Sequence, residues 1–165
     1  MPTFLRLVLV RHGQVAANRD FRYVGSNDEP LTDVGREQAR LLGVAIAQIS
    51  PLRLYSSPLL RALETARAIG DRSGVQIEVD PTLREQSFGR WEGLTRSEVA
   101  ELSREDAEIL QRFDRCAEVA PPGGESHLEL RSRLLSLIER LEGLQDHGGA
   151  PIVLVSHVDV LSPRS

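Results

Sequence analysis

The sequence contains no lysine: all 20 basic residues of this 165-residue chain are arginines, and 24 acidic residues give it a net charge of −4. A nucleic-acid-binding domain normally has a basic face, which this balance does not favour. The single cysteine, Cys116, excludes an internal disulfide and provides too few thiols for a cysteine zinc cluster. The apolar run from Leu7 to Val10 is too short for a membrane span or a signal-peptide core. We therefore expect a cytoplasmic protein that binds neither nucleic acid nor a membrane.

Aromatic residues are also scarce, at 4% of the chain, but 41% of the residues are apolar and 27% are charged. These proportions are typical of globular proteins, and 165 residues fit one domain of ordinary size. No repeat or low-complexity linker divides the chain. The sequence thus predicts a single domain over residues 1–165.

Short apolar runs alternate with amphipathic segments along the chain. The first run, from Phe4 to Val10, is continuous, which suits a strand buried on both faces. Further strands are expected over 52–56, 75–79 and 152–155. Helices are expected to begin after Thr32, at Ser57-Pro58, and at the capping-box pairs Thr95/Glu98 and Ser126/Glu129. This alternation predicts an α/β fold, a three-layer sandwich with a mostly parallel sheet and helices on both faces.

Three of the predicted strands end on polar residues. These are Arg11-His12-Gly13, Ser56-Ser57 ahead of Arg61, and Ser156-His157. Because the carboxyl ends of parallel strands lie at one edge of a sheet, where ligands bind, we expect the three groups to converge on one site.

The residue types at this edge suit a phosphate group. Arg11 has a permanent charge and forked donors that match phosphate, and Gly13 leaves room for a ligand to approach the backbone. A neutral His12 can act as a nucleophile. Arg61, in the first turn of a helix, adds charge where helix N-termini already attract anions, although a surface arginine is the alternative. For His157 the alternative is a histidine packed at the sheet edge.

A carboxyl group for acid catalysis is found in the only aromatic-rich loop, residues 83–93. Glu85 is the candidate for a general acid, and an ion pair with a neighbouring arginine is the alternative for it and for Glu92. For Trp91 the alternative is simple packing, which is compatible with lining a pocket. No spacing of His, Asp and Glu resembles a metal site, so we expect no metal and no cofactor.

Together these motifs resemble the histidine phosphatase superfamily, and more narrowly its phosphoglycerate-mutase-like branch of small broad-specificity and α-ribazole-phosphate phosphatases. The resemblance spans nearly the whole chain in the expected order. The matching segments are Leu9–Gln14, Asn18, Gly25–Asp28, Pro30–Thr32, Gly35–Ala39, Ser56–Ala62, Glu64–Ala66, Phe88–Gly93, Pro122–Ser126 and Val155–His157.

The resemblance implies a phosphatase that acts on a small-molecule phosphate ester through a phosphohistidine on His12. It implies that Arg11, Arg61 and His157 surround the phosphoryl oxygens and that Glu85 protonates the leaving alcohol and then helps to activate water. Asn18 and Gly25 would join Arg11, Arg61 and His157 in binding the substrate. Residues 86–125 would form the lid over the phosphate.

The chain departs from the family pattern after His157. Val158-Asp159 stands where relatives have two small residues, so that the branched Val158 would crowd the phosphate and the carboxylate of Asp159 would repel it if it pointed inward. The C-terminal helix and strand of the family are expected to be missing, which would leave a sheet edge open. An open edge favours a homodimer, in which a second copy covers it. These departures leave a non-catalytic phosphate-binding relative as one alternative to the phosphatase. A phosphoglycerate mutase is the other, which the shortness of the chain disfavours.

Overall fold

The computed structural model describes residues 5–143 and 149–161, and a four-stranded sheet lies at its centre. The strands follow the order β1-β4-β2-β3, and every neighbouring pair is parallel. The last strand of the chain is therefore inserted between the first two. The strand bounds are β1 (Leu7–Arg11), β2 (Arg53–Ser56), β3 (Ile77–Val79) and β4 (Ile152–Ser156).

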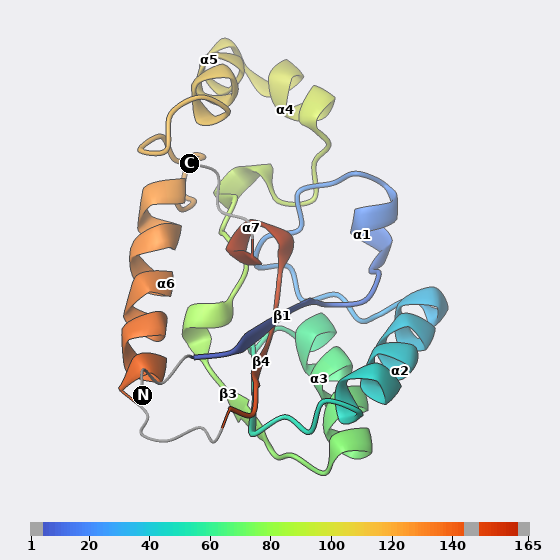
Figure 1. Ribbon diagram of the computed structural model, residues 1–165. Coiled ribbons are helices and arrows are strands. Elements are labelled where there is room, and N and C mark those ends of the chain that lie inside the picture. The colour runs from blue at the N-terminus through green and yellow to red at the C-terminus, as the bar shows by residue number, and fades with distance from the viewer. Residues whose placement is uncertain (1–4, 144–148, 162–165) are drawn as a thin grey trace.

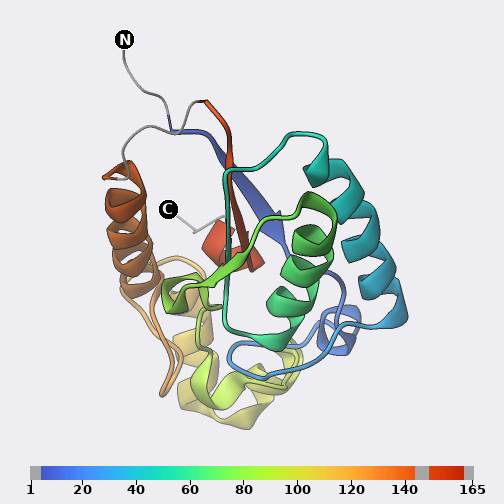
Figure 2. The same cartoon turned by 90° about the horizontal axis from the view of Figure 1, so that it is seen from below.

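Helices cover both faces of this sheet (Figures 1 and 2). On one face lie α2 (Asp33–Ala47) and α3 (Leu60–Ser73), and on the other lies α6 (His127–Glu142). The predicted three-layer α/β sandwich is thus confirmed. Shorter helices complete the connections: α1 (Ala16–Arg19), α7 (Val158–Leu161) and the 3₁₀ helices η1 (Pro81–Leu83) and η2 (Gly89–Trp91). No helix of the described residues is long and apolar enough to cross a membrane.

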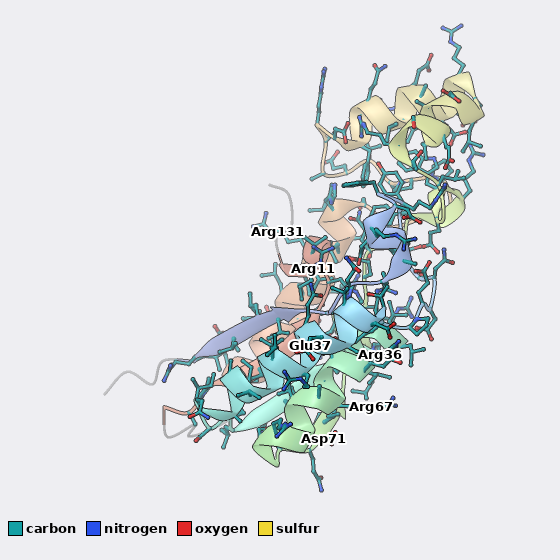
Figure 3. The ribbon with its side chains drawn as sticks, turned by 90° about the vertical axis from the view of Figure 1, so that its right-hand side faces the viewer. Arg11, Arg36, Glu37, Arg67, Asp71 and Arg131 are labelled. Atoms are coloured by element: carbon teal, nitrogen blue, oxygen red, sulfur yellow. The ribbon has the colours of Figure 1, made fainter. Side chains whose placement is uncertain are left out.

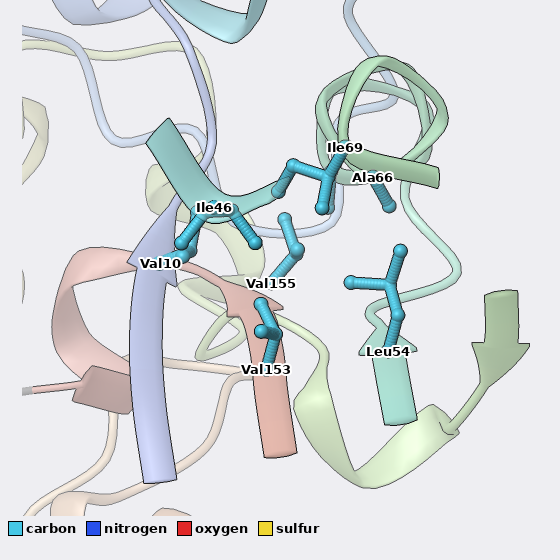
Figure 4. Packing of buried hydrophobic residues seen from close by; sticks show 8 residues of the cluster. Val10, Ile46, Leu54, Ala66, Ile69, Val153 and Val155 are labelled. Carbon is cyan, nitrogen blue, oxygen red and sulfur yellow. The ribbon is translucent and has the colours of Figure 1, made fainter. Parts of the chain in front are cut away.

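Each face of the sheet has its own apolar core, and β4 contributes to both. Towards α2 and α3, valines of β1 and β4 pack against Ile46, Ala66 and Ile69 (Figure 4). Towards α6, the alternate side chains of β4 pack with leucines of the helix. This second cluster comprises Tyr55, Leu83, Leu137, Leu141, Ile152 and Leu154. Because successive side chains of a strand point to opposite faces, the continuous apolar sequence of β4 supplies both layers.

The outer faces of α2 and α3 are charged and exposed to solvent. Arg36 and Glu37 of α2, and Arg67 and Asp71 of α3, lie on this side of the molecule (Figure 3). The two helices therefore show the amphipathic pattern expected of a layer that covers a sheet.

The first strand differs from the prediction, because β1 is not buried on both faces. Within the described residues it is an edge strand, paired only with β4, and the side chain of Leu9 is 52% exposed. The strand that is buried at every position is β4. A continuous apolar run thus identified a strand but not its place in the sheet.

The helix expected at Ser57-Pro58 begins later, at Leu60, with Leu59 as the N-cap residue. The N–H of Ser57 donates to the carbonyl of Val155 at 2.9 Å, so Ser57 still continues the strand ladder and is not part of the helix. The other predicted helix starts are confirmed: Thr32 caps α2, and both capping boxes are formed.

Besides η2, residues 86–125 contain two α-helices, α4 (Arg96–Leu102) and α5 (Arg104–Phe113), which lie beyond the carboxyl end of the sheet (Figure 1). The sequence pattern predicted only the first of them. Ser103 separates the two, and its side chain caps α5 by accepting from the N–H of Asp106. This segment has an apolar cluster of its own, which comprises Phe88, Trp91, Val99, Leu110 and Phe113.

Candidate active site

The register of the sheet places the predicted site residues next to one another at the carboxyl ends of the strands. Arg11, the last residue of β1, is the partner of Ser156, and Ser56 at the end of β2 is the partner of Val155. His12 and His157 follow these strand ends directly, and their ring centroids are 5.0 Å apart. The convergence of the two histidines at one edge is therefore observed.

His12 is held by backbone groups on both sides. Its N–H donates to the carbonyl of Ser156 at 3.0 Å, and its ring Nδ1 lies 2.7 Å from the carbonyl oxygen of Gly13. Since a carbonyl oxygen only accepts, Nδ1 carries the hydrogen, and the lone pair of the neutral ring is on Nε2. The ring is thus oriented with its nucleophilic nitrogen directed away from Gly13.

The charge state of His12 follows from its surroundings. Burial, with a smaller effect of the charges of Arg61 and Arg11, lowers the pKa of His12 to about 4, although the hydrogen bond to Gly13 acts in the opposite direction. At neutral pH the ring is therefore uncharged, as a nucleophile requires.

Gly13 is also required by packing. A Cβ at this position would lie 2.4 Å from the carbonyl oxygen of Gly35, so the close approach of α2 leaves room only for glycine. The N–H of Gly13 donates to Oγ1 of Thr65 at 3.1 Å, and Thr65 in turn donates to the carbonyl of Arg61. The sequence pattern did not predict this linking role of Thr65, whose signals are its place in the matching segment Glu64–Ala66 and one helical turn after Arg61.

Arg61 is completely buried at the start of α3, which excludes the surface alternative. Its Nη1 donates to the carbonyl of Asn27 at 2.6 Å and its Nη2 to that of Gly25 at 2.8 Å. Among the described residues its buried Nε has no hydrogen-bond partner. Burial lowers the pKa of Arg61, and nearby carboxylates, Glu85 first among them, raise it in part. A buried guanidinium with an unused donor fits an oxyanion.

His157 is also completely buried, and Ser57 and Glu85 lie on its two sides. Its Nε2 is 2.8 Å from Oγ of Ser57, and its Nδ1 is 3.9 Å from Oε2 of Glu85. Burial, followed by the charge of Arg61, lowers the pKa of His157 well below its ordinary value. The ring is therefore neutral, and it lies between the candidate nucleophile and the candidate acid.

Asn18 lines two of the cavities that adjoin these residues. One, of about 370 Å³, is lined only by polar side chains: Arg11, His12, Gln14, Asn18, Arg19 and Gln38. The other, of about 130 Å³, is mixed in character; its lining includes Asn18, Tyr23, Glu85, Phe88, Phe113 and Val158. An ester group at the histidines would thus have both a polar and a partly aromatic surface beside it.

The remaining predicted residues are placed as follows. Gly25 contacts Arg61 through its carbonyl, and a Cβ on it would overlap the side chain of Glu92. Glu92 accepts from the N–H groups of Ser26 and Phe88, so it fixes loops and is not the acid candidate.

Val158 lines the mixed cavity, and the side chain of Asp159 lies outside what the structure describes. No cluster of three or more potential metal ligands occurs in residues 5–143 and 149–161.

This chain is similar to known proteins over most of its length. The family model of the histidine phosphatase superfamily (branch 1) matches residues 7–163. A glucosyl-3-phosphoglycerate phosphatase of Mycolicibacterium vanbaalenii is 43% identical over 157 residues, which cover 92% of this chain and 68% of that protein.

Solved structures extend the likeness to the fold. A mycobacterial glucosyl-3-phosphoglycerate phosphatase complexed with VO3 has a TM-score of 0.86 at 33% identity, covering 96% of this chain and 78% of that one. The alpha-ribazole phosphatase from Shigella flexneri has a TM-score of 0.84 at 33% identity, covering 96% and 76%.

Proposed function

This chain belongs to the histidine phosphatase superfamily and is a phosphatase, and we propose that it hydrolyses phosphomonoesters through a phosphohistidine on His12, without a metal ion. The observation that carries the proposal is the placement of His12, whose Nδ1 lies 2.7 Å from the carbonyl oxygen of Gly13, so that Nε2 is left as the nucleophile, and whose ring is 5.0 Å from that of the buried His157.

In the first step, the lone pair on Nε2 of His12 attacks phosphorus and the bond to the leaving oxygen breaks. Glu85 gives its proton to that oxygen, so an alcohol leaves and a phosphohistidine remains. Arg11, Arg61 and His157 stabilise the charge on the non-bridging oxygens, and Asn18 donates a further hydrogen bond.

In the second step, water attacks the phosphohistidine and gives a proton to the carboxylate of Glu85. The P–N bond breaks, phosphate is released, and the neutral His12 and protonated Glu85 are restored. The charge of the phosphoryl group is balanced by guanidinium groups in both steps, which is why a metal ion is not needed.

The polar cavity beside Arg11 and Asn18 supports a substrate whose alcohol bears hydroxyl or carboxylate groups. The relatives named glucosyl-3-phosphoglycerate phosphatase point to the same chemistry, and we propose a phosphorylated sugar acid of this kind as the first substrate to test. Residues 86–125, which lie beyond the carboxyl end of the sheet, would act as the lid.

The test is the hydrolysis of p-nitrophenyl phosphate by the native chain and by His12→Ala. We expect the substitution to lower kcat by at least about a thousandfold, since it removes the nucleophile. Rapid acid-free denaturation of the native protein during turnover should trap an alkali-stable phosphoryl group on His12, detected by mass spectrometry. Appreciable turnover by His12→Ala with an unchanged melting temperature would contradict the proposal.

The proposal that the reaction needs no metal ion is tested separately with EDTA. Turnover should be unchanged after chelation and after addition of a divalent ion. Loss of activity that a divalent ion restores would refute this part while leaving the role of His12 open to its own test.

A further inference from the structure

Arg133, on α6, contacts the backbone of the segment that carries Glu85. Its Nη1 donates to the carbonyl of Thr82 at 2.6 Å and its Nη2 to the carbonyl of Glu85 at 3.2 Å. The chain from Arg84 to Phe88 forms no helix or strand. The position of Glu85 therefore depends on contacts of this kind rather than on regular structure.

Glu125 holds Arg133 in place through two parallel bonds. Nε of Arg133 lies 2.7 Å from Oε1 of Glu125 and Nη2 lies 2.9 Å from Oε2, and the two side chains are only 22% and 20% exposed. A forked, partly buried pair of this geometry fixes the guanidinium plane. Only an arginine provides this fork.

Glu125 is in turn bonded to the residues that follow Glu85. Its N–H donates to the carbonyl of Ser87 at 2.8 Å, and its carbonyl accepts from Nε2 of Gln86 at 2.7 Å. Arg133 and Glu125 thus clamp the segment from both sides, at Thr82 and Glu85 and at Gln86 and Ser87.

We propose that Arg133 is a positioning residue for Glu85, which keeps the carboxyl group within reach of the leaving oxygen. The inference rests on the proposed role of Glu85 as the general acid. Because proton transfer requires close placement of the acid, a displaced Glu85 would impair substrates with poor leaving groups most.

The experiment compares an alkyl phosphate, whose leaving oxygen needs a proton, with p-nitrophenyl phosphate, whose leaving group departs without one. For Arg133→Lys we expect kcat/KM, which covers only the steps up to departure of the alcohol, to fall by about tenfold or more on the alkyl ester and to change much less on the nitrophenyl ester. Glu125→Gln, which weakens the clamp and keeps Arg133, should show the same selectivity to a smaller extent.

The matched control is Arg140→Lys. Arg140 lies on the same helix and bonds to Asp80 and, at 3.4 Å, to the side chain of Thr82, without touching the backbone of Thr82 or Glu85. It should leave both rates nearly unchanged. One contrary result is that Arg133→Lys loses activity equally on the two esters, and another is that Arg140→Lys shows the same losses as Arg133→Lys. Either result would indicate a merely structural role and overturn the inference.

Glu85→Gln separates this inference from the proposed function. If it lowers kcat/KM selectively on the alkyl ester and Arg133→Lys does not, Arg133 is not a positioning residue although Glu85 is the acid. If Glu85→Gln is not selective, the acid assignment fails and this inference fails with it. In the double variant, Arg133→Lys should add no loss to that of Glu85→Gln, because it acts only through that side chain.

Discussion

At the scale of single residues, backbone carbonyl groups orient the side chains of the site. The carbonyl of Gly13 selects the tautomer of His12, and those of Gly25 and Asn27 hold Arg61. Such contacts leave no mark in the sequence, because every residue has a carbonyl group. The convergence of the polar side chains at the strand ends could therefore be predicted, but the backbone groups that orient these side chains could not.

The low pKa of His12 makes a prediction about stability. In the unfolded chain its pKa returns to about 6.5, so at pH 5 the unfolded state binds a proton that the folded state, with a pKa of about 4, does not. Stability is therefore lost as the pH falls below about 6.5. Between pH 7.5 and pH 5, the free energy of unfolding should fall further for the native chain than for His12→Gln. The difference between the two decreases should be about 2 kcal/mol.

Urea unfolding at the two pH values measures this difference. Between pH 7.5 and pH 9, where His12 is neutral in both states, native and variant chains should show the same change. Equal pH dependence of the two chains below pH 7.5 would show that His12 is not buried in a neutral form.

At the scale of elements, the sequence predicted most helix starts and the layered arrangement, but not the place of each strand within the sheet. The capping boxes at Thr95 and Ser126 are formed as expected, because their partners lie three residues away. The position of β1 at the sheet edge depends on which strands are its neighbours, a non-local property that an apolar run does not encode. The same reason applies to the start of α3 at Leu60, since the hydrogen bond by which Ser57 still belongs to the strand ladder is made to the distant β4.

The contact of α2 with α3 predicts a second effect on stability. A Cβ at Gly43 would lie 2.3 Å from the carbonyl oxygen of Ala68, a backbone atom that cannot move without separating the helices. Gly43→Ala should therefore lower the free energy of unfolding by about 2 kcal/mol in urea, despite the higher helix propensity of alanine.

Gly143→Ala is the matched control, since the nearest atoms to a Cβ there are 3.5 and 3.6 Å away and φ is −71°. It should change stability by less than about 1 kcal/mol. If both variants behave alike, close packing of α2 on α3 does not explain the glycine at position 43.

At the scale of the whole molecule, the sheet and the segment 86–125 contribute different parts of the site. The strand ends and α3 carry His12, His157 and Arg61, whereas the segment 86–125 brings Phe88 and Phe113 to the mixed cavity. Its apolar cluster is separate from the two cores of the sheet. We infer that the two parts can differ in local stability.

Asp106 is the polar centre of the segment 86–125. It is 2% exposed and accepts from Nε1 of Trp91 at 2.8 Å, from the guanidinium of Arg90 and from Oγ of Ser103 at 2.6 Å. These hydrogen bonds lower the pKa of Asp106, that of Ser103 most. The carboxylate thus links η2 to the start of α5 by accepting from three side chains.

Asp106→Asn should loosen this segment alone, because an amide nitrogen would face donors that need an acceptor. We expect amide hydrogen exchange in α4 and α5 to become roughly tenfold faster, while exchange in β4 stays unchanged. The matched control is Glu108→Gln on α5, whose exposed pair with Arg104 contributes little. Faster exchange in β4 as well would show that the segment and the sheet unfold together, and the two parts would then form one cooperative unit.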